Sequence, residues 1–274
     1  MPPAVRGEMP GFAVPPRNPS GGLRRPQHNG HAHAAVKSTS KVCTAAWSYT
    51  HNILLVIIMR MRKKPNLIPR MERCAGVQIK NPAEYKGKWR SIMPEASSLH
   101  LELGCGKGRF TAGTARSFPD TLFIAVEKVR DAMVVAMERV CGEEIPNVRF
   151  IDMDAMNLRE IFENGEVSRI YINFCDPWPG NKHAKRRLTS PGFLAIYRDI
   201  LAPGGEIHFK TDNNPLFEYS LESFKQNGFS LHEVTRNLHE NGPVGIMTDY
   251  EEKFFNQGLN INRCVARLMP KEAE

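Results

Sequence analysis

Short hydrophobic segments alternate with amphipathic ones along residues 99–268. Four apolar residues, Met133, Val134, Met137 and Val140, share one face of a helix predicted over 129–140. A second helix is predicted over 191–201, closed by a Pro203-Gly204-Gly205 turn. The hydrophobic segments predict strands at 99–103, 121–126, 148–152, 169–176, 206–211, 230–237 and 262–268. This alternation predicts an α/β fold with a mostly parallel sheet, whose ligands bind at the carboxyl ends of the strands.

The N-terminal part of the chain has a different character. Residues 1–34 contain seven prolines and five glycines and show no periodicity, so they bury too little apolar surface to fold. The apolar run 53–59 is shorter than the ~20 residues of a membrane-spanning helix, and it lies too far from Met1 for a signal peptide. We expect residues 1–58 to be a disordered extension or a misassigned start. A basic arm with a helical region is expected over 59–98, and the folded domain over 99–270.

The charge of the chain is concentrated near its N-terminus. The 274 residues carry 37 Lys and Arg against 29 Asp and Glu, a net charge of +8. Residues 1–64 hold ten basic groups and one acid, which leaves 27 basic and 28 acidic groups in 65–274. The net charge alone is therefore no argument for a nucleic-acid partner. The six cysteines are scattered without metal-ligand spacing, which indicates a cytoplasmic protein with neither disulfides nor a bound metal.

A glycine-rich turn follows the first predicted strand. Gly104, Gly106 and Gly108 form the pattern G-x-G-x-G, which differs from the G-x-G-x-x-G of dinucleotide-binding proteins. Glu102, two residues before the turn, would repel a pyrophosphate, but it suits a cofactor with an ammonium group, such as S-adenosylmethionine. The alternative is an ordinary turn with a surface glutamate.

Acidic residues also end the next two predicted strands. Glu127 lies 19 residues after Gly108, where a carboxylate can accept both hydroxyls of an adenosine ribose. After the third strand, either Asp152 or Asp154 could bind an adenine amino group, and strand alternation does not choose between them. An N-cap for a helix starting near Asn157 is the alternative role.

The fourth cluster combines an aspartate with a basic segment. Asp176 precedes Pro177-Trp178-Pro179, and Trp178 could stack on a base or pack against the loop. Within six residues follow four positive charges and a histidine: Lys182, His183, Lys185, Arg186 and Arg187. Beside a cofactor site this density indicates contact with a polyanion, whereas elsewhere it would indicate a solvated helix face.

These motifs together resemble the bacterial tRNA (guanine-N7)-methyltransferases. The resemblance runs from about Met59 to about residue 268, and it rests on E-x-G-x-G-x-G, V-E, D-P-W-P with H-A-K-R-R-L, T-D-N and T-x-Y-E. It implies a Rossmann-like, seven-stranded methyltransferase sheet, mostly parallel with a final antiparallel strand and with helices on both faces. It also implies methyl transfer from S-adenosylmethionine to N7 of the guanine at position 46, in the variable loop of tRNA.

The resemblance assigns roles to particular residues. Asp176 is the implied catalytic residue. The implied cofactor-binding residues are Glu102, Gly104, Gly106, Gly108, Glu127, Asp154 and Asp176. The implied RNA-contacting residues are Lys182, His183, Lys185, Arg186, Arg187, Asp212, Thr248, Asp249, Tyr250 and Glu251. The spacing of Thr248 and Glu251 also predicts a capping box that opens a helix.

One position departs from the family pattern. The family commonly has a lysine after D-P-W-P, where this chain has Gly180 and Asn181, so a basic substrate contact is missing there. The geometry of Lys182 would differ, and this contact is not transferred to it. Alternative functions are an amino-methyltransferase acting on nucleic acid, an NAD-dependent oxidoreductase and a non-catalytic RNA-binding module. We expect tRNA as the partner, no membrane association and no metal, with a monomer or a homodimer equally compatible.

Overall fold

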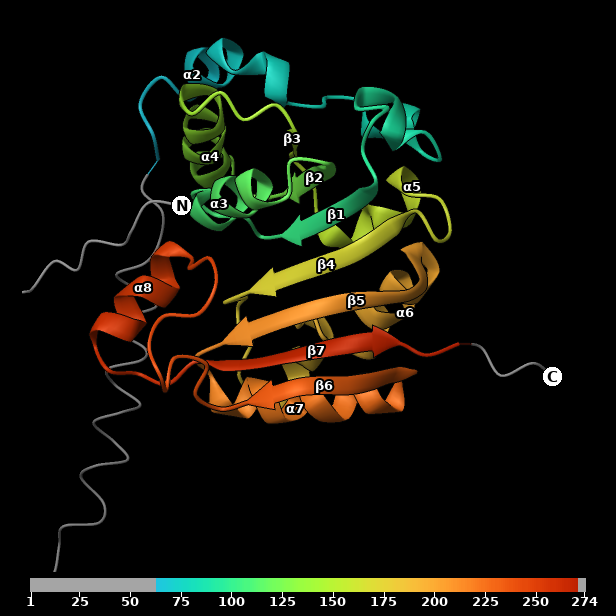
Figure 1. Cartoon of the computed structure of the whole chain (residues 1–274), viewed down its shortest axis with the longest axis vertical. Helices are drawn as coiled ribbons and strands as arrows, with labels where there is room; N and C mark the ends of the chain where they lie inside the picture. Colours follow the sequence, from blue (N-terminus) through green and yellow to red (C-terminus); the bar gives the residue numbers. More distant parts are fainter. Residues whose placement is uncertain (1–62, 271–274) are drawn as a thin grey trace, which may run out of the picture. The chain divides into compact units, whose positions relative to one another are not determined.

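A mixed sheet forms the centre of the structure (Figure 1). The computed structural model describes residues 63–270. The strand order is β3-β2-β1-β4-β5-β7-β6, with β7 antiparallel to both of its neighbours and the pairs from β3 to β5 parallel. The strands are β1 Ser98–Leu103, β2 Thr121–Val126, β3 Val148–Ile151, β4 Val167–Asn173, β5 Leu201–Thr211, β6 Phe229–Thr235 and β7 Asn262–Leu268. The mostly parallel sheet and its final antiparallel strand confirm the prediction.

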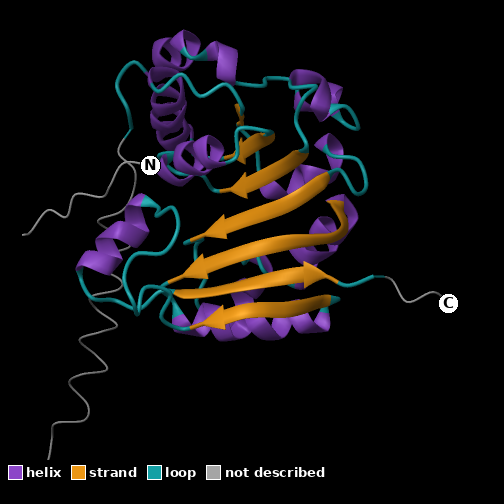
Figure 2. Cartoon of the chain, viewed as in Figure 1, coloured by secondary structure: helices purple, strands orange, loops and turns teal. Residues whose placement is uncertain are grey.

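Helices cover both faces of this sheet, as Figure 2 shows. On one face lie α2 Leu67–Arg73, α3 Arg109–Ser117 and α4 Arg130–Gly142; on the other lie α5 Leu158–Ile161, α6 Pro191–Ile200 and α7 Asn214–Gln226. The helix α8 Asp249–Asn256, between β6 and β7 in the sequence, lies at the end of the sheet where β1, β4 and β5 finish.

The middle strands are apolar on both sides because both faces are covered. Along β2, Leu122 and Ile124 pack into the core under α5, α6 and α7, whereas Phe123 and Ala125 pack toward α3 and α4. All four are fully buried, and burial of each large apolar side chain contributes roughly 1.5–3 kcal/mol. The order of strands reverses between β1 and β4, and a crevice at such a point is where open α/β sheets bind ligands.

Two predicted boundaries differ most from the structure. The strand predicted to reach Asp176 ends at Asn173, because Phe174 has φ 53 and Pro177 has no N–H to donate. Asp176 therefore lies in a loop. The residues 203–205 do not form a turn after α6; they lie inside β5, where the pairing with β4 is irregular.

The segment before β1 contains α2 and three short 3₁₀ helices, Ala75–Val77, Pro82–Tyr85 and Trp89–Ile92. Trp89 anchors this segment, since its ring is fully buried and its indole N–H donates to the carbonyl of Ile161 at 2.8 Å. The expectations for residues 1–58 lie outside the described residues. Between residues 63 and 270, no helix has the length and apolar character needed to cross a membrane.

Candidate active site

The glycine turn joins β1 to α3 and combines two kinds of glycine. Gly104, Gly106 and Gly108 have φ of 77°, 55° and 76°, a left-handed conformation that favours glycine. A Cβ on Gly108 would lie 2.6 Å from the Cβ of Ala136 in α4, whereas one on Gly104 or Gly106 meets nothing within 4 Å. Gly108 therefore lets two helices approach, and the first two glycines leave the backbone open to a ligand.

Glu102 lies beneath this turn and is not a surface residue. It is 2% exposed, and its carboxylate accepts a hydrogen bond from the Thr111 hydroxyl at 2.5 Å and from Asn173 Nδ2 at 3.5 Å. Burial raises the pKa of Glu102 to about 7, opposed by the two hydrogen bonds. A cation placed beside this buried carboxyl would stabilise its ionised form. The burial therefore fits the predicted role of binding the ammonium group of a cofactor, and it excludes the alternative of a surface glutamate.

Glu127, at the end of β2, is tied to the same turn. Its carboxylate accepts hydrogen bonds from the backbone N–H of Gly106 at 3.0 Å and of Val129 at 2.9 Å. Burial raises the pKa of this carboxyl, and the two N–H donors oppose that effect. Glu102 and Glu127 thus flank the turn from two adjacent strands, and their predicted contacts with a cofactor stay predictions.

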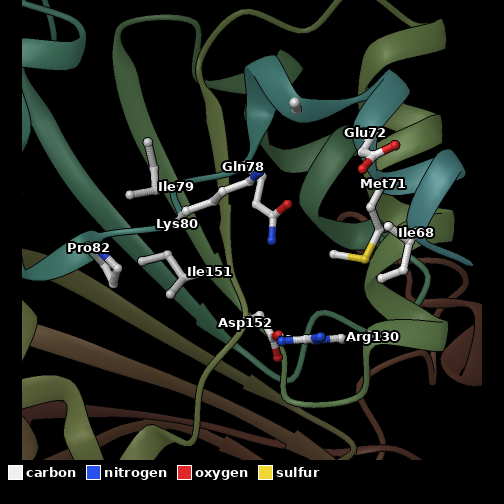
Figure 3. A pocket seen from close by; sticks show the side chains of 11 residues that line it. Ile68, Met71, Glu72, Gln78, Ile79, Lys80, Pro82, Arg130, Ile151 and Asp152 are labelled. Carbon is white, nitrogen blue, oxygen red and sulfur yellow. Dashed lines mark hydrogen bonds and ion pairs between the residues drawn. The ribbon is translucent and has the colours of Figure 1, made fainter.

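The structure distinguishes the two aspartates after β3. Asp152 forms an ion pair with Arg130 and faces a hollow of about 290 Å³ beside α2, which no other candidate site residue lines (Figure 3). Asp154 is exposed and caps the 3₁₀ helix Ala155–Asn157, since its Oδ1 accepts from the N–H of Met156 at 3.0 Å. The Oδ2 of Asp154 lies 4.0 Å from Lys128 Nζ and stays open to a ligand, so capping and adenine binding are compatible.

Asp176 is exposed in the loop after β4, and no donor among residues 63–270 bonds to its carboxylate. Arg187 holds this loop in place: its guanidinium donates to the carbonyls of Pro177 and Trp178 at 3.2–3.3 Å and lies 4.2 Å from the ring centre of Tyr219. Arg187 therefore holds the loop through Nε and Nη2, and its predicted contact with RNA stays a prediction.

The rest of the basic segment is more open. It forms the 3₁₀ helix Asn181–Arg186, on which Lys182, Lys185 and Arg186 are exposed. The Arg186 guanidinium lies 3.7 Å from the ring centre of Trp178, and the His183 ring lies 6.2 Å from it. Three positive charges thus remain available to a polyanion, and Trp178 packs within the loop.

The predicted capping box of α8 is present, but Glu251 has a further role. The Thr248 hydroxyl accepts from the N–H of Glu251 at 3.0 Å, and Glu251 accepts from the N–H of Thr248 at 3.2 Å. The Glu251 carboxylate is fully buried and also accepts from Lys210 Nζ at 2.6 Å and His239 Nε2 at 3.1 Å. His239 donates through Nε2 because its Nδ1 accepts from the N–H of Val244. Burial and these partners give the Glu251 carboxylate a structural role, and its predicted contact with substrate stays a prediction.

Tyr250 and Asp249 from the same motif are accessible, and so is Asp212. Tyr250 is 38% exposed; burial of part of its ring and the neighbouring carboxylates, with Asp176 first among them, raise the pKa of its phenol. Asp212 is exposed directly after β5. The charges of Asp176 and Glu127, from distant parts of the sequence, thus both act on the phenol of Tyr250.

Lys210 and His239 were missed in the sequence analysis. Lys210 lies on the same side of β5 as Glu206 and His208, and the apolar Ile207 and Phe209 lie on the other side. This alternation was a signal that one side of the strand carries charged groups. Burial lowers the pKa of Lys210, and Glu251 opposes that change. No signal in the sequence marked His239.

Comparison with known proteins identifies the family. The model of the family described as "Putative methyltransferase" matches residues 96–264. The tRNA (guanine-N(7)-)-methyltransferase of Bacillus velezensis is 44% identical over 215 residues, which cover 78% of this chain and 99% of that protein. The chain belongs to the tRNA (guanine-N7)-methyltransferase family. The member of this family from Bacillus subtilis is 46% identical over 207 residues, covering 75% of this chain and 97% of that protein.

Solved structures of other methyltransferases share the fold of this member of the tRNA (guanine-N7)-methyltransferase family. The 16S rRNA methyltransferase KamB superposes with a TM-score of 0.54 at 14% identity, over 67% of this chain and 94% of that one. A 16S rRNA (adenine(1408)-N(1))-methyltransferase variant from Catenulisporales acidiphilia, solved with its cosubstrate SAM, gives 0.52 at 12% identity, over 69% and 93%. The predicted methyltransferase fold is confirmed, and the oxidoreductase alternative has no support. Within residues 63–270, no group of three or more His, Cys, Asp or Glu side chains is arranged to hold a metal ion.

Proposed function

We propose that the protein transfers a methyl group from S-adenosylmethionine to N7 of a guanine in tRNA, at position 46 of the variable loop. The observation that carries this proposal is the placement of Asp176: an exposed carboxylate with no donor among the described residues, in a loop fixed by Arg187 beside Tyr250. The similarity to named tRNA (guanine-N(7)-)-methyltransferases over almost their whole length supports it.

The residues at the turn fit S-adenosylmethionine. Gly104 and Gly106 leave room at the backbone. The buried carboxyl of Glu102 accepts hydrogen bonds from two neutral groups, the Thr111 hydroxyl and the Asn173 amide. In our proposal Glu127 binds the ribose hydroxyls and Asp154 the adenine amino group. The bound cofactor supplies a methyl group on a sulfonium, which is electrophilic without further activation.

Guanine chemistry sets what the protein must contribute. N7 of guanine has an in-plane lone pair and no proton, so the attacking atom needs no general base. The protein must place N7 in line with the methyl group and stabilise the positive charge that the purine acquires. We assign both tasks to Asp176, which holds the guanine edge and faces the developing cation with a full negative charge.

The exposed cations of the basic segment support an RNA partner. Lys182, Lys185 and Arg186 offer three phosphate contacts, and three contacts predict a slope of roughly −2 to −3 in a plot of log affinity against log salt. We also propose a cytoplasmic location, as for an enzyme that acts on tRNA. A monomer and a homodimer are both compatible with this function.

The test is methyl transfer from radiolabelled S-adenosylmethionine to bulk tRNA, followed by nucleoside analysis. We expect 7-methylguanosine from the wild-type chain and a loss of at least about 100-fold from Asp176→Ala. The matched control is Asp199→Asn, an exposed aspartate paired with Arg159. Thermal unfolding should be unchanged in both variants. A methylated adenine or cytosine as the product, or near-normal transfer by Asp176→Ala, would contradict the proposal.

A further inference from the structure

Asn173, the last residue of β4, has a buried side-chain oxygen that receives no hydrogen bond. The residue is 7% exposed, and no donor among the described residues reaches its Oδ1. Buried acceptors are normally paired, because leaving one unpaired costs free energy. Four buried side-chain atoms in residues 63–270 share this condition, and of these residues Asn173 is the one that donates to a buried carboxylate, Glu102.

Within residues 63–270, the cation that neighbours Asn173 in the sheet, Lys210, already has hydrogen-bond partners of its own. Glu102, Asn173 and Lys210 lie near the carboxyl ends of three adjacent strands, and Asn173 pairs with Lys210 in the sheet register. The Lys210 ammonium is hydrogen-bonded to Glu251 and to the carbonyl of Ile246. Glu102 receives only the Thr111 hydroxyl and the Asn173 amide. The pair formed by Glu102 and Asn173 thus lacks a positively charged donor.

We propose that Asn173 Oδ1 and the Glu102 carboxylate together accept the α-ammonium of the methyl donor. Asn173 is then a cofactor-binding residue that selects donors carrying an amino group. Glu102 orients the amide by accepting from its Nδ2, which leaves Oδ1 able to accept from a further donor. The assignment rests on the proposed function, since it requires S-adenosylmethionine at this turn. Because Oδ1 is buried, neighbouring side chains must move when the ligand enters.

The experiment separates the amino group from the rest of the ligand. Isothermal titration calorimetry on the full chain measures the affinity for S-adenosylhomocysteine and for its analogue without the α-amino group. In the wild type we expect the complete compound to bind more tightly. Asn173→Leu keeps the branched shape of the side chain but removes the acceptor, together with the N–H that donates to Glu102. It should weaken S-adenosylhomocysteine by roughly 10- to 100-fold and the analogue by less than about twofold.

A matched control tests whether any buried oxygen would behave in this way. Thr114 has an unpaired buried hydroxyl in α3, so Thr114→Val should leave the preference for the amino group unchanged. Equal weakening of both ligands by Asn173→Leu would indicate a structural role and overturn the assignment, as would no weakening at all. A wild-type chain that binds both ligands equally would overturn the assignment alone. One that binds neither would overturn the proposed function and the assignment with it.

Discussion

Replacing Glu251 by leucine should destabilise the protein strongly. The carboxylate is fully buried and accepts hydrogen bonds from Lys210, His239 and the N–H of Thr248. Leucine has a similar size but no acceptor. In Glu251→Leu the buried ammonium of Lys210 keeps only the carbonyl of Ile246 at 3.3 Å, and its charge is no longer balanced.

The expected loss follows from this geometry. Removing one partner of a buried ion pair costs about 3–5 kcal/mol, because the remaining charge stays out of water. Domains of this kind have about 5–15 kcal/mol of total stability, so the variant should lose a large fraction of it. The neighbouring Glu252 provides a matched control. Its side chain is 46% exposed and pairs with Arg109 at the surface, where water screens the pair, so Glu252→Leu should cost far less stability than Glu251→Leu.

Urea unfolding of the full chain at pH 7.5, followed by circular dichroism, measures both losses. The double variant Glu251→Leu with Lys210→Met should recover part of the stability, because no buried ammonium remains. Recovery should be incomplete, since His239 Nε2 still lacks its acceptor. Equal losses for Glu251→Leu and Glu252→Leu would refute the reasoning, and so would additive losses in the double variant.

Three further predictions follow from other parts of the structure. Burial lowers the pKa of His100 to about 3, so the unfolded chain takes up the proton first as the pH falls below 6.5. Between pH 7 and 5 the wild type should therefore lose about 2 kcal/mol of unfolding free energy that the His100→Phe variant does not lose. Urea unfolding at each pH measures this difference. Gly108→Ala should lower stability by about 2–4 kcal/mol, measured by thermal unfolding, because the added Cβ meets Ala136. Gly106→Ala should lower stability by about 1–2 kcal/mol, and its main effect should be weaker binding of S-adenosylhomocysteine in calorimetry. Arg187→Ala should lower kcat for tRNA methylation at least about tenfold, because it loosens the loop that carries Asp176. Lys185→Ala should raise KM for tRNA and leave kcat within about twofold. Equal effects of the two variants in steady-state kinetics would contradict this division.

Much of the fold could be predicted from the sequence because strand and helix patterns are local. The segments at 121–126 and 262–268 have the predicted bounds, and the capping box at Thr248 was visible from two residue types three positions apart. The strand leading to Asp176 was predicted too long, because the left-handed backbone of Phe174 has no signature in residue type. Hydrophobic pattern does not encode where such a strand ends.

The site was harder to predict where burial decides a role. Glu251 and Asp249 look equivalent in the sequence, yet the first is fully buried and the second half-buried. Lys210 and His239 become its partners only through tertiary contacts across 41 and 12 positions. Likewise, Arg186 and Arg187 are adjacent and identical, but only the folded loop gives one of them carbonyl oxygens to bind. Residue type and spacing predict which charged groups a segment carries, whereas the fold decides which of them are buried and paired.

The two kinds of glycine in the turn also bear on how this protein could change over evolutionary time. Gly104 and Gly106 have open space in place of a side chain, whereas Gly108 meets Ala136 of α4. A descendant that had lost its cofactor would be free to accept asparagine, which tolerates the left-handed conformation, at the first two positions. At the third position glycine would still be favoured, because a side chain there meets α4 and lowers stability. A relative that retains only the third glycine would therefore carry the signature of an enzyme that has become a scaffold.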